Sequence, residues 1–470
     1  MSEMPDGMAP TADGLRQVLE GLAVRFGERF SIAQAVREQH GKGEAWHAVR
    51  PPDGVVWCAT TEEAAAVVGL CAAHDVPVVP FGAGSSLEGQ LCALRGGISL
   101  DLTRMNRILE VNDADLDVHV EAGVTRKQLN AHLRDMGLFF PIDPGADATL
   151  GGMAATRASG TNAVRYGTMK ENVLGVTVVM PDGHVARFGG RARKSSAGYD
   201  LTRLLVGSEG TLGVITELRL KLYGIPEAIS AAVCSFPSLE AAVHTVIETI
   251  QIGVPVARVE LLDEVQMGAC IAYSKLEEMQ AAPTLFFEFH GSTTGVAEQA
   301  EMVESIAGSN GGSAFRWTTN TEERNRLWQA RHDVYYAALG LRPGAKALAT
   351  DICVPISALA EAILAAQADI RASGLVAPIV GHVGDGNFHV QLMIDPDDAD
   401  EMAKAQAINA AMVERALAVG GTCTGEHGIG IGKIDKLQKE HASALPYMIA
   451  VKRALDPRGI MNPGKIFHMN

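Results

Sequence analysis

Apolar residues along the chain recur with two periods, and these periods separate predicted helices from predicted strands. Intervals of three or four residues, typical of one helix face, predict helices over residues 11–38, 61–74 and 125–136. Thr60 or Thr61 is the expected N-cap of the second of these helices. Short apolar runs predict strands over residues 55–57, 78–81, 98–102, 118–120, 173–180 and 185–188. The first half of the chain is therefore expected to form an α/β arrangement that opens with strand, helix and strand.

After Leu222 glycine becomes rarer, and longer helices alternate with strands. Helices are predicted over residues 239–252, 300–307, 358–372 and 401–419. Strands are predicted over residues 231–236, 285–291, 379–383 and 389–394. This order predicts a second domain, an antiparallel sheet with helices on one face, and a boundary near Gly224-Ile225-Pro226. A chain of 470 residues is long enough for two cores. We expect an N-terminal helical segment over 1–45, domains over 46–225 and 226–420, and a C-terminal segment over 421–470 that docks on the rest.

Three glycine-rich clusters lie in the first half, and the first of them organises the rest. Residues 78–89 run from an apolar strand into a loop of glycines and hydroxyls, where backbone N–H groups can converge on an anion. No lysine ends this loop as a Walker A motif requires, and Leu87 stands where a Rossmann motif needs its third glycine. The simpler alternative is an ordinary glycine-rich turn. The other clusters cover residues 144–167 and 207–216.

Charge and composition exclude several classes of function. The formal net charge is −15, which argues against binding to nucleic acid or to an anionic membrane surface. No apolar run is long enough to predict a transmembrane segment. The seven cysteines are scattered singly, as expected in a reducing compartment. The first residues lack the features of a signal or transit peptide, so a cytoplasmic location is expected.

Six motifs together resemble one family of flavoproteins. They are PFGAGSSLEG, GGMAATRASGTNAVRYG, GSEGTLGVITE, GHVGDGNFH, GEHGIG and NPGKIF. Between residues 45 and 467 the chain resembles the vanillyl-alcohol-oxidase-type flavoproteins, and within them the FAD-dependent D-2-hydroxyacid dehydrogenases, above all the D-lactate branch. The resemblance implies an α+β fold with a two-part FAD-binding PCMH-type domain and an antiparallel-sheet cap domain that binds the substrate.

The resemblance also implies which residues contact FAD. The first loop would hold the pyrophosphate, the other clusters the ribityl chain and the ring, and the tail would return to the flavin. The implied residues are Pro80, Phe81, Gly82, Ala83, Gly84, Ser85, Ser86, Gly89, Gln90, Pro144, Gly145, Ala146, Leu150, Gly151, Gly152, Ala155, Ser159, Gly160, Arg165, Tyr166, Gly167, Glu209, Gly210, Gly213, Ile215 and Asn462. Only Ser85 and Ser86 stand where relatives with covalent flavin carry an attachment residue, so non-covalent FAD is implied.

Residues 381–389 predict a metal site. If Asp385-Gly386 is a two-residue hairpin turn, His382 lies directly opposite His389, and both imidazoles can bind one divalent ion. The alternative is a pair of structural histidines. A carboxylate should complete the site. The resemblance implies that Glu426 is this third ligand and that His427 is the base beside the substrate hydroxyl. Zn, Mn, Fe and Co all fit such a site.

The resemblance implies that Arg331 and Lys346 hold the substrate carboxylate; the alternative is that they are surface charges on a helix and a loop. Tyr335 lies one helical turn after Arg331, and this spacing predicts that it borders the pocket. His290 and His332 are expected to be structural. Members that handle D-2-hydroxyglutarate tend to carry Asn where this chain has Gln391, so a smaller substrate is expected.

The expected function is oxidation of a small D-2-hydroxy acid, with D-lactate first, to the 2-oxo acid by hydride transfer to flavin. The alternatives are a D-2-hydroxyglutarate or glycolate dehydrogenase, and a non-catalytic FAD-binding subunit of an oxidoreductase complex. A flavin-using alkyl transferase is disfavoured, because His382 and His389 are spaced rather than part of a histidine-rich run. The electron acceptor stays open among a quinone, a cytochrome, an electron-transfer flavoprotein and oxygen, and a homodimer is the ordinary expectation.

Overall fold

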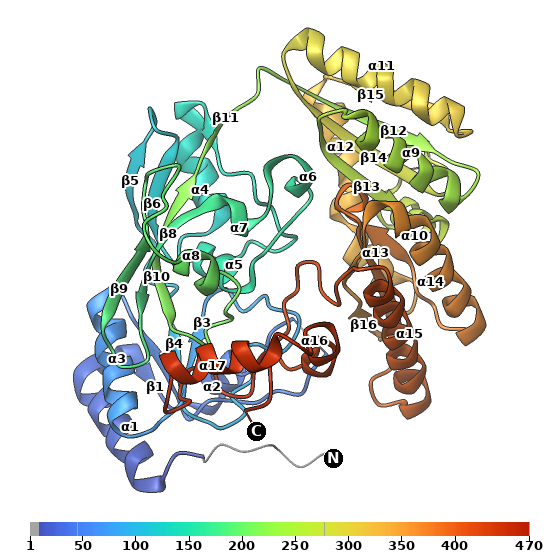
Figure 1. Ribbon diagram of the computed structural model, residues 1–470. Helices are drawn as coiled ribbons and strands as arrows, with labels where there is room; N and C mark the ends of the chain where they lie inside the picture. The colour runs from blue at the N-terminus through green and yellow to red at the C-terminus, as the bar shows by residue number, and fades with distance from the viewer. Residues whose placement is uncertain (1–8, 45, 277, 470) are drawn as a thin grey trace. The chain divides into compact units, whose positions relative to one another are not determined.

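The chain folds into two compact units. The structure is a computed structural model that describes residues 9–44, 46–276 and 278–469. The first unit comprises Met1–Ser159, Thr168–Ile225 and Glu426–Asn470, and the second comprises Gly160–Gly167 and Pro226–Gly425. Figure 1 follows the chain through both. The chain therefore passes between the units four times, at 159–160, 167–168, 225–226 and 425–426.

The first unit opens with a small, mostly parallel sheet. Its strands, in spatial order, are β1 (Phe30–Ser31), β2 (Gly54–Trp57), β4 (Ile98–Asp101) and β3 (Val78–Phe81). Helix α3 (Thr61–Ala73) connects β2 to β3, and the Thr60 hydroxyl caps it by accepting from Glu63 N at 3.2 Å. The strand–helix–strand prediction is confirmed. A continuous helix over 11–38 is wrong, because α1 (Ala12–Phe26) ends at Gly27 with φ +53°, and β1 and α2 (Gln34–His40) follow.

A five-stranded antiparallel sheet completes the first unit. Its strands, in spatial order, are β5 (Ile108–Asn112), β6 (Asp117–Glu121), β10 (Val214–Lys221), β8 (Val173–Val179) and β9 (Val185–Gly189). The helices beside it are α4 (Arg126–Leu133), α5 (Leu150–Thr156), α7 (Met169–Asn172) and α8 (Leu201–Leu205). One apolar core serves both sheets. The predicted pairing of 173–180 with 185–188 is confirmed by β8 and β9.

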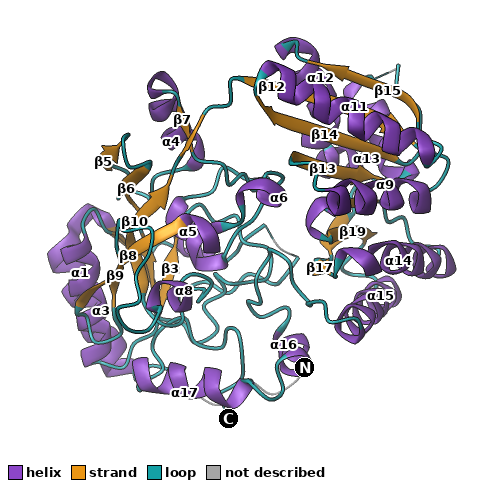
Figure 2. Cartoon of the chain, turned by 45° about the horizontal axis from the view of Figure 1, so that its top comes forward, coloured by secondary structure: helices purple, strands orange, loops and turns teal. Residues whose placement is uncertain are grey.

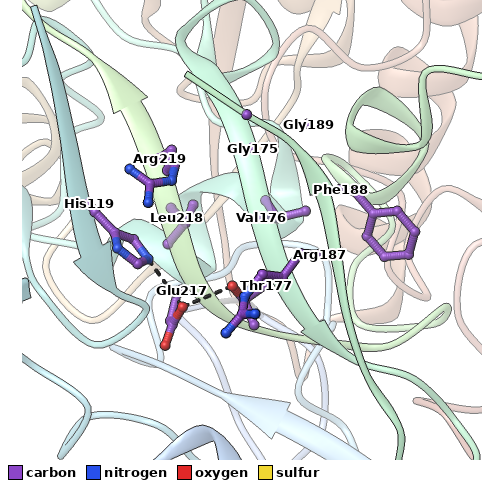
Figure 3. A pocket seen from close by; sticks show the side chains of 11 residues that line it. His119, Gly175, Val176, Thr177, Arg187, Phe188, Gly189, Glu217, Leu218 and Arg219 are labelled. Atoms are coloured by element: carbon purple, nitrogen blue, oxygen red, sulfur yellow. Dashed lines mark hydrogen bonds and ion pairs between the residues drawn. The ribbon is translucent and has the colours of Figure 1, made fainter. Parts of the chain in front are cut away.

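A pocket opens on this sheet where Gly175 pairs with Gly189. Figure 3 shows the polar side chains in it: His119 Nε2 lies 3.1 Å from Glu217, and the Thr177 hydroxyl donates to the same carboxylate at 2.8 Å. None of the residues that line this pocket belongs to the predicted site.

The C-terminal segment packs on the first unit, as predicted. It contains α16 (Ile434–Glu440) and α17 (Leu445–Leu455), and beyond them Met461 forms a parallel bridge with Val78 of β3. The buried Lys452 ammonium donates to the carbonyls of Thr211, at 2.6 Å, and Met461, at 2.9 Å, and to the Asp456 carboxylate. This lysine therefore joins the tail to the third glycine cluster.

The second unit is built on one antiparallel sheet, as predicted. Its strands, in spatial order, are β15 (Ser313–Thr318), β12 (Ala228–Ser235), β14 (Thr284–Gly291), β13 (Val256–Leu262), β18 (Ile379–Gly381), β19 (Asn387–Ile394) and β16 (Lys346–Ala349), and β17 (Ile352–Cys353) also pairs with β19. Figure 2 shows β12, β14 and β13 side by side. The helices are α6 (Ala163–Tyr166), α9 (Leu239–Ile252), α10 (Glu264–Ser274), α11 (Thr293–Ser309), α12 (Thr321–His332), α13 (Val334–Gly340), α14 (Leu359–Ser373) and α15 (Ala399–Ala418).

Helices cover both faces of this sheet, so the prediction of helices on one face is wrong. Helix α11 packs on the face that carries Gly291, and α9 and α14 lie beside it. On the other face Trp328 of α12 and Val334 of α13 share an apolar cluster with Phe286 of β14 and Val380 of β18. The hydrophobic pattern did not predict α12 because its only large apolar residues, Leu327 and Trp328, are adjacent and show no helical periodicity. Among the described residues, no helix combines the length and apolar character needed to cross a membrane.

Lys452→Met should destabilise the protein by about 3–5 kcal/mol, because it leaves the fully buried Asp456 carboxylate without its cation. Thermal or urea unfolding measures the change. Lys404→Met is the matched control: its ion pair with Asp400 is exposed, so its loss should cost less than about 1 kcal/mol. Equal losses in the two variants would contradict this account of the tail.

Candidate functional site

The first glycine loop has the shape of an anion cradle with unused donors. Gly84 has φ +77°, a conformation that L side chains rarely adopt. A Cβ on Gly82 would lie 2.3 Å from Thr149 Oγ1, so the loop lies directly on the residue that precedes α5. Ser86 Oγ is buried and has no hydrogen-bond partner in the described part of the chain. An orphaned buried hydroxyl beside open glycine backbone fits a diphosphate group.

The three glycine clusters meet within the first unit, except for one segment. Gly210 of the third cluster lies against Pro80, since a Cβ there would approach the proline ring to 2.9 Å. Leu150, Gly151, Gly152 and Ala155 lie on α5, Pro144, Gly145 and Ala146 precede that helix, and Gly213 leads into β10 with Ile215. Ser159 ends the part of the second cluster that belongs to the first unit.

Residues 160–167 of the second cluster fold with the second unit instead. The Tyr166 hydroxyl donates to His290 Nδ1 at 2.7 Å, and His290 Nε2 faces the Glu288 carboxylate at 2.8 Å. Arg165 donates to the Pro255 carbonyl. The two flanking glycines, Gly160 and Gly167, both have positive φ. Arg165 and Tyr166, predicted to contact FAD, are thus also anchors of this segment in the second unit.

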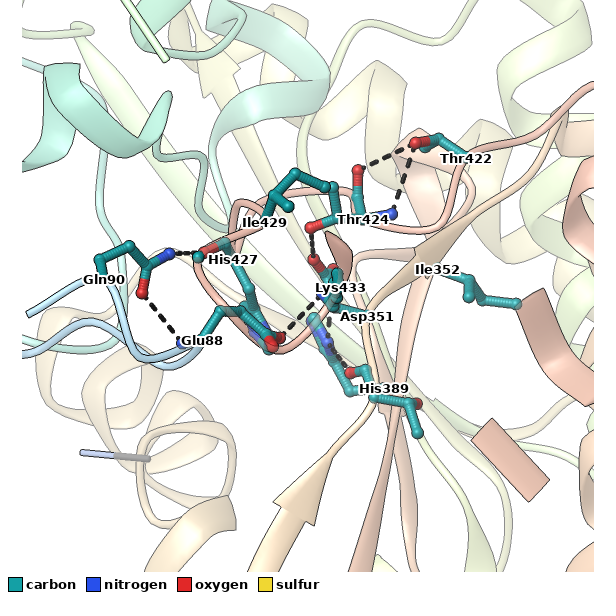
Figure 4. Close-up of polar contacts among 12 residues, drawn as sticks. Glu88, Gln90, Asp351, Ile352, His389, Thr422, Thr424, His427, Ile429 and Lys433 are labelled. Carbon is teal, nitrogen blue, oxygen red and sulfur yellow. Dashed lines mark hydrogen bonds and ion pairs between the residues drawn. The ribbon is translucent and has the colours of Figure 1, made fainter. Parts of the chain in front are cut away.

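Residues 427–433 form a loop whose backbone is held by two side chains, Glu209 and Gln90, and Figure 4 shows the contact from Gln90. The Glu209 carboxylate accepts hydrogen bonds from Ile429 N, at 2.7 Å, and Gly430 N, at 2.8 Å. Gln90 donates to the His427 carbonyl at 2.9 Å. Asn462 donates to the carbonyls of Gln90 and Glu209. Gln90, Glu209 and Asn462 are predicted FAD contacts, and in the structure their side chains also position this loop and the tail. Their contacts to FAD stay predictions.

The charge state of Glu209 depends on this arrangement. Burial raises the pKa of the Glu209 carboxyl to about 7, while its two backbone N–H donors act in the opposite direction. The residue has φ +51°, outside the range that side chains prefer. Glu209 therefore combines a strained backbone conformation with a buried carboxyl group at the point where the third glycine cluster contacts the loop.

His427 lies in this loop beside Glu88 of the first glycine cluster. Its Nδ1 is 3.6 Å from Glu88 Oε1, which in turn lies 2.9 Å from Lys433 Nζ. Burial would raise the pKa of the Glu88 carboxyl, but the charge of Lys433 and the neighbouring His427 imidazole lower it below its usual value. Gly89 has φ +74°, and a Cβ on it would meet Ile431, so this predicted FAD contact also faces the loop.

In the second unit, His382 and His389 lie close together, but by a different route from the predicted hairpin. Val380, not His382, lies opposite His389, because Val383–Asp385 forms a 3-10 turn and Gly386 ends it with φ +79°. The two-residue turn at Asp385-Gly386 is therefore wrong. His382 follows β18 directly, and its ring centroid lies 5.5 Å from that of His389. His382 and His389 are therefore close together, as predicted, although the strand register differs from the predicted one.

Hydrogen bonds present the same nitrogen of both imidazoles to a ligand. His389 Nδ1 donates to the Thr350 carbonyl at 2.9 Å, and His382 Nδ1 donates to the Glu260 carboxylate at 2.7 Å. With a proton held on each Nδ1, each Nε2 carries a lone pair. This arrangement is typical of metal-binding histidines, whose second nitrogen donates to a carboxylate or carbonyl. The donor set therefore fits a divalent cation.

Glu260 is the functional residue that the sequence analysis missed. Its side chain is fully buried on β13, and it also accepts a 2.6 Å hydrogen bond from Arg331 Nε. Burial would raise the pKa of this carboxyl, but His382 and Arg331 lower it below its usual value. The only sign of this role in the sequence was that Glu260, like Arg258, interrupts the apolar run 256–262.

The predicted substrate clamp is only partly assembled. Arg331 lies on α12 and is bound to Glu260. Lys346 is exposed and pairs with Ile394, which puts it on the opposite face of the sheet from His389. Tyr335 is 45% exposed, and α12 ends at His332 before it, so the one-turn spacing from Arg331 does not apply. The side chain of His332 lies outside the described residues.

The buried Asp351 carboxylate holds the segment of chain that precedes Glu426, the third predicted metal ligand. Asp351 accepts from Asn387 Nδ2 at 2.9 Å and from Thr424 Oγ1 at 2.7 Å, so it joins β19 to residues 422–425 (Figure 4). A Cβ on Gly425 would lie 2.3 Å from Asn387 Nδ2. Glu426 follows directly in the chain as the first residue of the next segment of the first unit. Its role as a metal ligand stays a prediction.

Two family models and several curated proteins match the chain. The family described as FAD linked oxidases, C-terminal domain, matches residues 225–466, and the FAD binding domain family matches residues 52–189. The chain is 51% identical to the probable mitochondrial D-lactate dehydrogenase of Danio rerio, over 98% of this chain and 93% of that protein. It is 44% identical to the mitochondrial D-lactate dehydrogenase [cytochrome] of Arabidopsis thaliana, over 96% and 79%.

A solved structure supports the fold. The structure of p-cresol methylhydroxylase with substrate bound superposes with a TM-score of 0.80, over 99% of this chain and 98% of that one, at 18% sequence identity. At such identity the likeness concerns the fold alone. It confirms the predicted α+β arrangement of a PCMH-type FAD-binding domain and a cap domain.

Glu209→Gln should flatten the pH dependence of stability. Because the folded pKa of Glu209, about 7, exceeds its ordinary 4.5, the folded state holds a proton that the unfolded state releases, and this contribution is lost as pH rises through 7. The unfolding free energy of wild type relative to the variant should fall by about 3 kcal/mol between about pH 4.5 and about pH 8. Parallel stability profiles in thermal unfolding of the two proteins would contradict the prediction.

Proposed function

Because the chain belongs to the FAD-linked oxidases, we propose that it is a FAD-dependent dehydrogenase that oxidises D-lactate to its 2-oxo acid. The observation that carries the proposal is the pair of buried imidazoles, His382 and His389, whose Nδ1 protons are engaged and whose Nε2 lone pairs are presented together. Relatives that are named D-lactate dehydrogenases support the choice of substrate.

FAD is held without a covalent bond in this proposal. The glycine backbone of residues 82–86 and the orphaned Ser86 hydroxyl would hold its diphosphate. When bound, FAD supplies the acceptor for the hydride that leaves C2 of the substrate. The tail and Lys452 keep the third cluster against this loop.

A divalent metal ion is the second cofactor in this proposal. His382 and His389 would hold it through Nε2, with Glu426 as the third ligand. When bound, such an ion acts as a Lewis acid on the substrate hydroxyl oxygen. The Glu260 carboxylate and the Thr350 carbonyl keep the two rings in the tautomer that a metal requires.

The remaining roles belong to two side chains. His427 accepts the hydroxyl proton as general base. Arg331 holds the substrate carboxylate with the guanidinium nitrogens that Glu260 leaves available, and Glu260 fixes the orientation of its side chain. Lys346 and Tyr335 are less favoured for this role, because both are exposed and outside the hydrogen-bonded group of Arg331, Glu260 and His382.

Glycolate and D-2-hydroxyglutarate are the competing substrates. Gln391, buried and two residues after His389 on the same strand, has a side-chain oxygen without a partner among the described residues, and it leaves less room than a shorter side chain would. We also propose a cytochrome as electron acceptor, in line with the relatives named D-lactate dehydrogenase [cytochrome], with a quinone or an electron-transfer flavoprotein as alternatives. A cytoplasmic location and a homodimer stay predictions, tested by fractionation and by light scattering.

Anaerobic addition of D-lactate should bleach the flavin absorbance of the purified protein. L-lactate should not, and glycolate and D-2-hydroxyglutarate should act more slowly. The visible spectrum before and after each addition measures the effect, and acid should release the flavin. If no hydroxy acid bleaches a protein loaded with FAD and metal, the non-catalytic subunit becomes the better interpretation.

Glu260→Gln should weaken metal binding about 10–100-fold, because Gln cannot offer His382 a charged acceptor. Metal content after dialysis against a graded chelator series measures the affinity, and bleaching by D-lactate should fall in parallel. Glu288→Gln, a change of a second buried acid on the adjacent strand β14, is the control and should keep its metal. Unchanged metal affinity in Glu260→Gln would contradict the proposed site.

A further inference from the structure

Glu88 stands in a place where a negative charge is unexpected. It belongs to the first glycine loop, whose backbone N–H groups are suited to a diphosphate, and an unpaired carboxylate there would repel such a ligand. The Glu88 side chain is only 9% exposed, and Lys433, 2% exposed, lies 2.9 Å from its Oε1. The loop therefore carries a buried ion pair whose partner comes from the C-terminal part of the chain.

The same carboxylate oxygen faces His427. Oε1 lies 3.6 Å from His427 Nδ1, and the imidazole, like the carboxylate, is 9% exposed. At 3.6 Å the two atoms lie within ion-pair range but beyond hydrogen-bond length. The negative charge of the carboxylate favours the tautomer with the proton on Nδ1, which leaves the lone pair on Nε2. We propose that Glu88 is a positioning residue that fixes the tautomer and ring orientation of His427, and that Lys433 holds Glu88 in place for this task. This inference rests on the proposed function of His427.

Backbone hydrogen bonds on both sides fix the separation of Glu88 and His427 (Figure 4). The Glu88 carbonyl accepts from Ile431 N at 2.8 Å and from Gly432 N at 3.2 Å. Gln90 accepts from Glu88 N at 3.0 Å and donates to the His427 carbonyl at 2.9 Å. The two residues are thus tied through the backbone as well as through their side chains.

Glycine at position 430 makes this close approach feasible. Gly430 has φ +51°, and a Cβ on it would lie 2.0 Å from the Glu88 carbonyl oxygen. No other residue would let the loop pass so close to the first glycine cluster. The close contact between Glu88 and the loop therefore requires glycine at position 430.

The consequence concerns the proton step. When the substrate O–H bond breaks, its proton passes to His427 Nε2 and the electron pair of that bond becomes the second bond of the C2 carbonyl. The C2–H electron pair leaves as hydride, for which bound FAD would be the acceptor. The imidazole then carries a positive charge, and the Glu88 carboxylate on its far side stabilises that charge, as the buried carboxylate of a catalytic triad does. The first glycine loop would serve both the cofactor and the base.

Glu88→Gln should lower kcat for D-lactate about a hundredfold and leave KM and the content of bound FAD nearly unchanged. Gln keeps the shape of the side chain, but its amide can stabilise the other tautomer. Glu88→Asp, which keeps the charge, should recover part of the rate, and Lys433→Met should lower kcat in the same direction. Single-turnover flavin reduction with saturating FAD gives the rate per bound flavin.

Glu121→Gln is the matched control, a buried acid of the first unit whose ion pair with Arg107 lies apart from these residues. It should keep the wild-type kcat. A kcat within about threefold of wild type in Glu88→Gln, while wild type reduces its flavin, would overturn the inference. If Glu88→Gln does not retain FAD, the rate per bound flavin in Glu88→Asp decides, and a wild-type value overturns it. Failure of wild type itself to react would instead contradict the proposed function.

Discussion

Two backbone N–H groups, those of Ile429 and Gly430, point at one buried carboxylate, that of Glu209, and the first unit is arranged around this contact. The carboxylate comes from the third glycine cluster, whereas the N–H groups come from a loop more than two hundred residues later in the chain. The tail contacts the same residue, because Asn462 donates to the Glu209 carbonyl. Since an unpaired carboxylate at this depth would be costly, the contact commits the C-terminal segment to the glycine clusters. The proposed base is positioned as a result.

In the second unit, too, a buried carboxylate accepts hydrogen bonds from two distant parts of the chain. Glu260, fully buried on β13, accepts from both His382 and Arg331, so one carboxylate orients the proposed metal ligand and the proposed carboxylate clamp. Asp351 does the same for Asn387 and Thr424 near His389. In both units, buried acids set the orientation of the reactive side chains. Because a buried carboxylate is costly unless it is paired, Glu260 and Asp351 are explained by the side chains that they hold.

Sequence patterns predicted most elements and the right family, and they failed where contacts between distant residues decide the outcome. The capped helix α3, the pair β8 and β9 and the antiparallel second sheet follow from local periodicity and turn residues. His382 and His389 were brought together for the wrong reason, because a 3-10 turn replaces the short hairpin. Gln90, Glu209 and Asn462 stand in or near glycine-rich motifs that predict cofactor contacts, and their additional bonds to distant protein backbone have no local signal in the sequence. Glu260 carried no motif at all. Its role depends on two partners that are 71 and 122 residues away.

Deuterium at C2 of the substrate tests the central claim most directly. In the proposed reaction the C2–H bond of a D-2-hydroxy acid breaks in the step that reduces the flavin. Anaerobic stopped-flow reduction with D-lactate and with D-lactate deuterated at C2 should therefore give a clear primary isotope effect on the rate of flavin bleaching. Equal rates in a protein loaded with FAD and metal, or no bleaching with either compound, would contradict it.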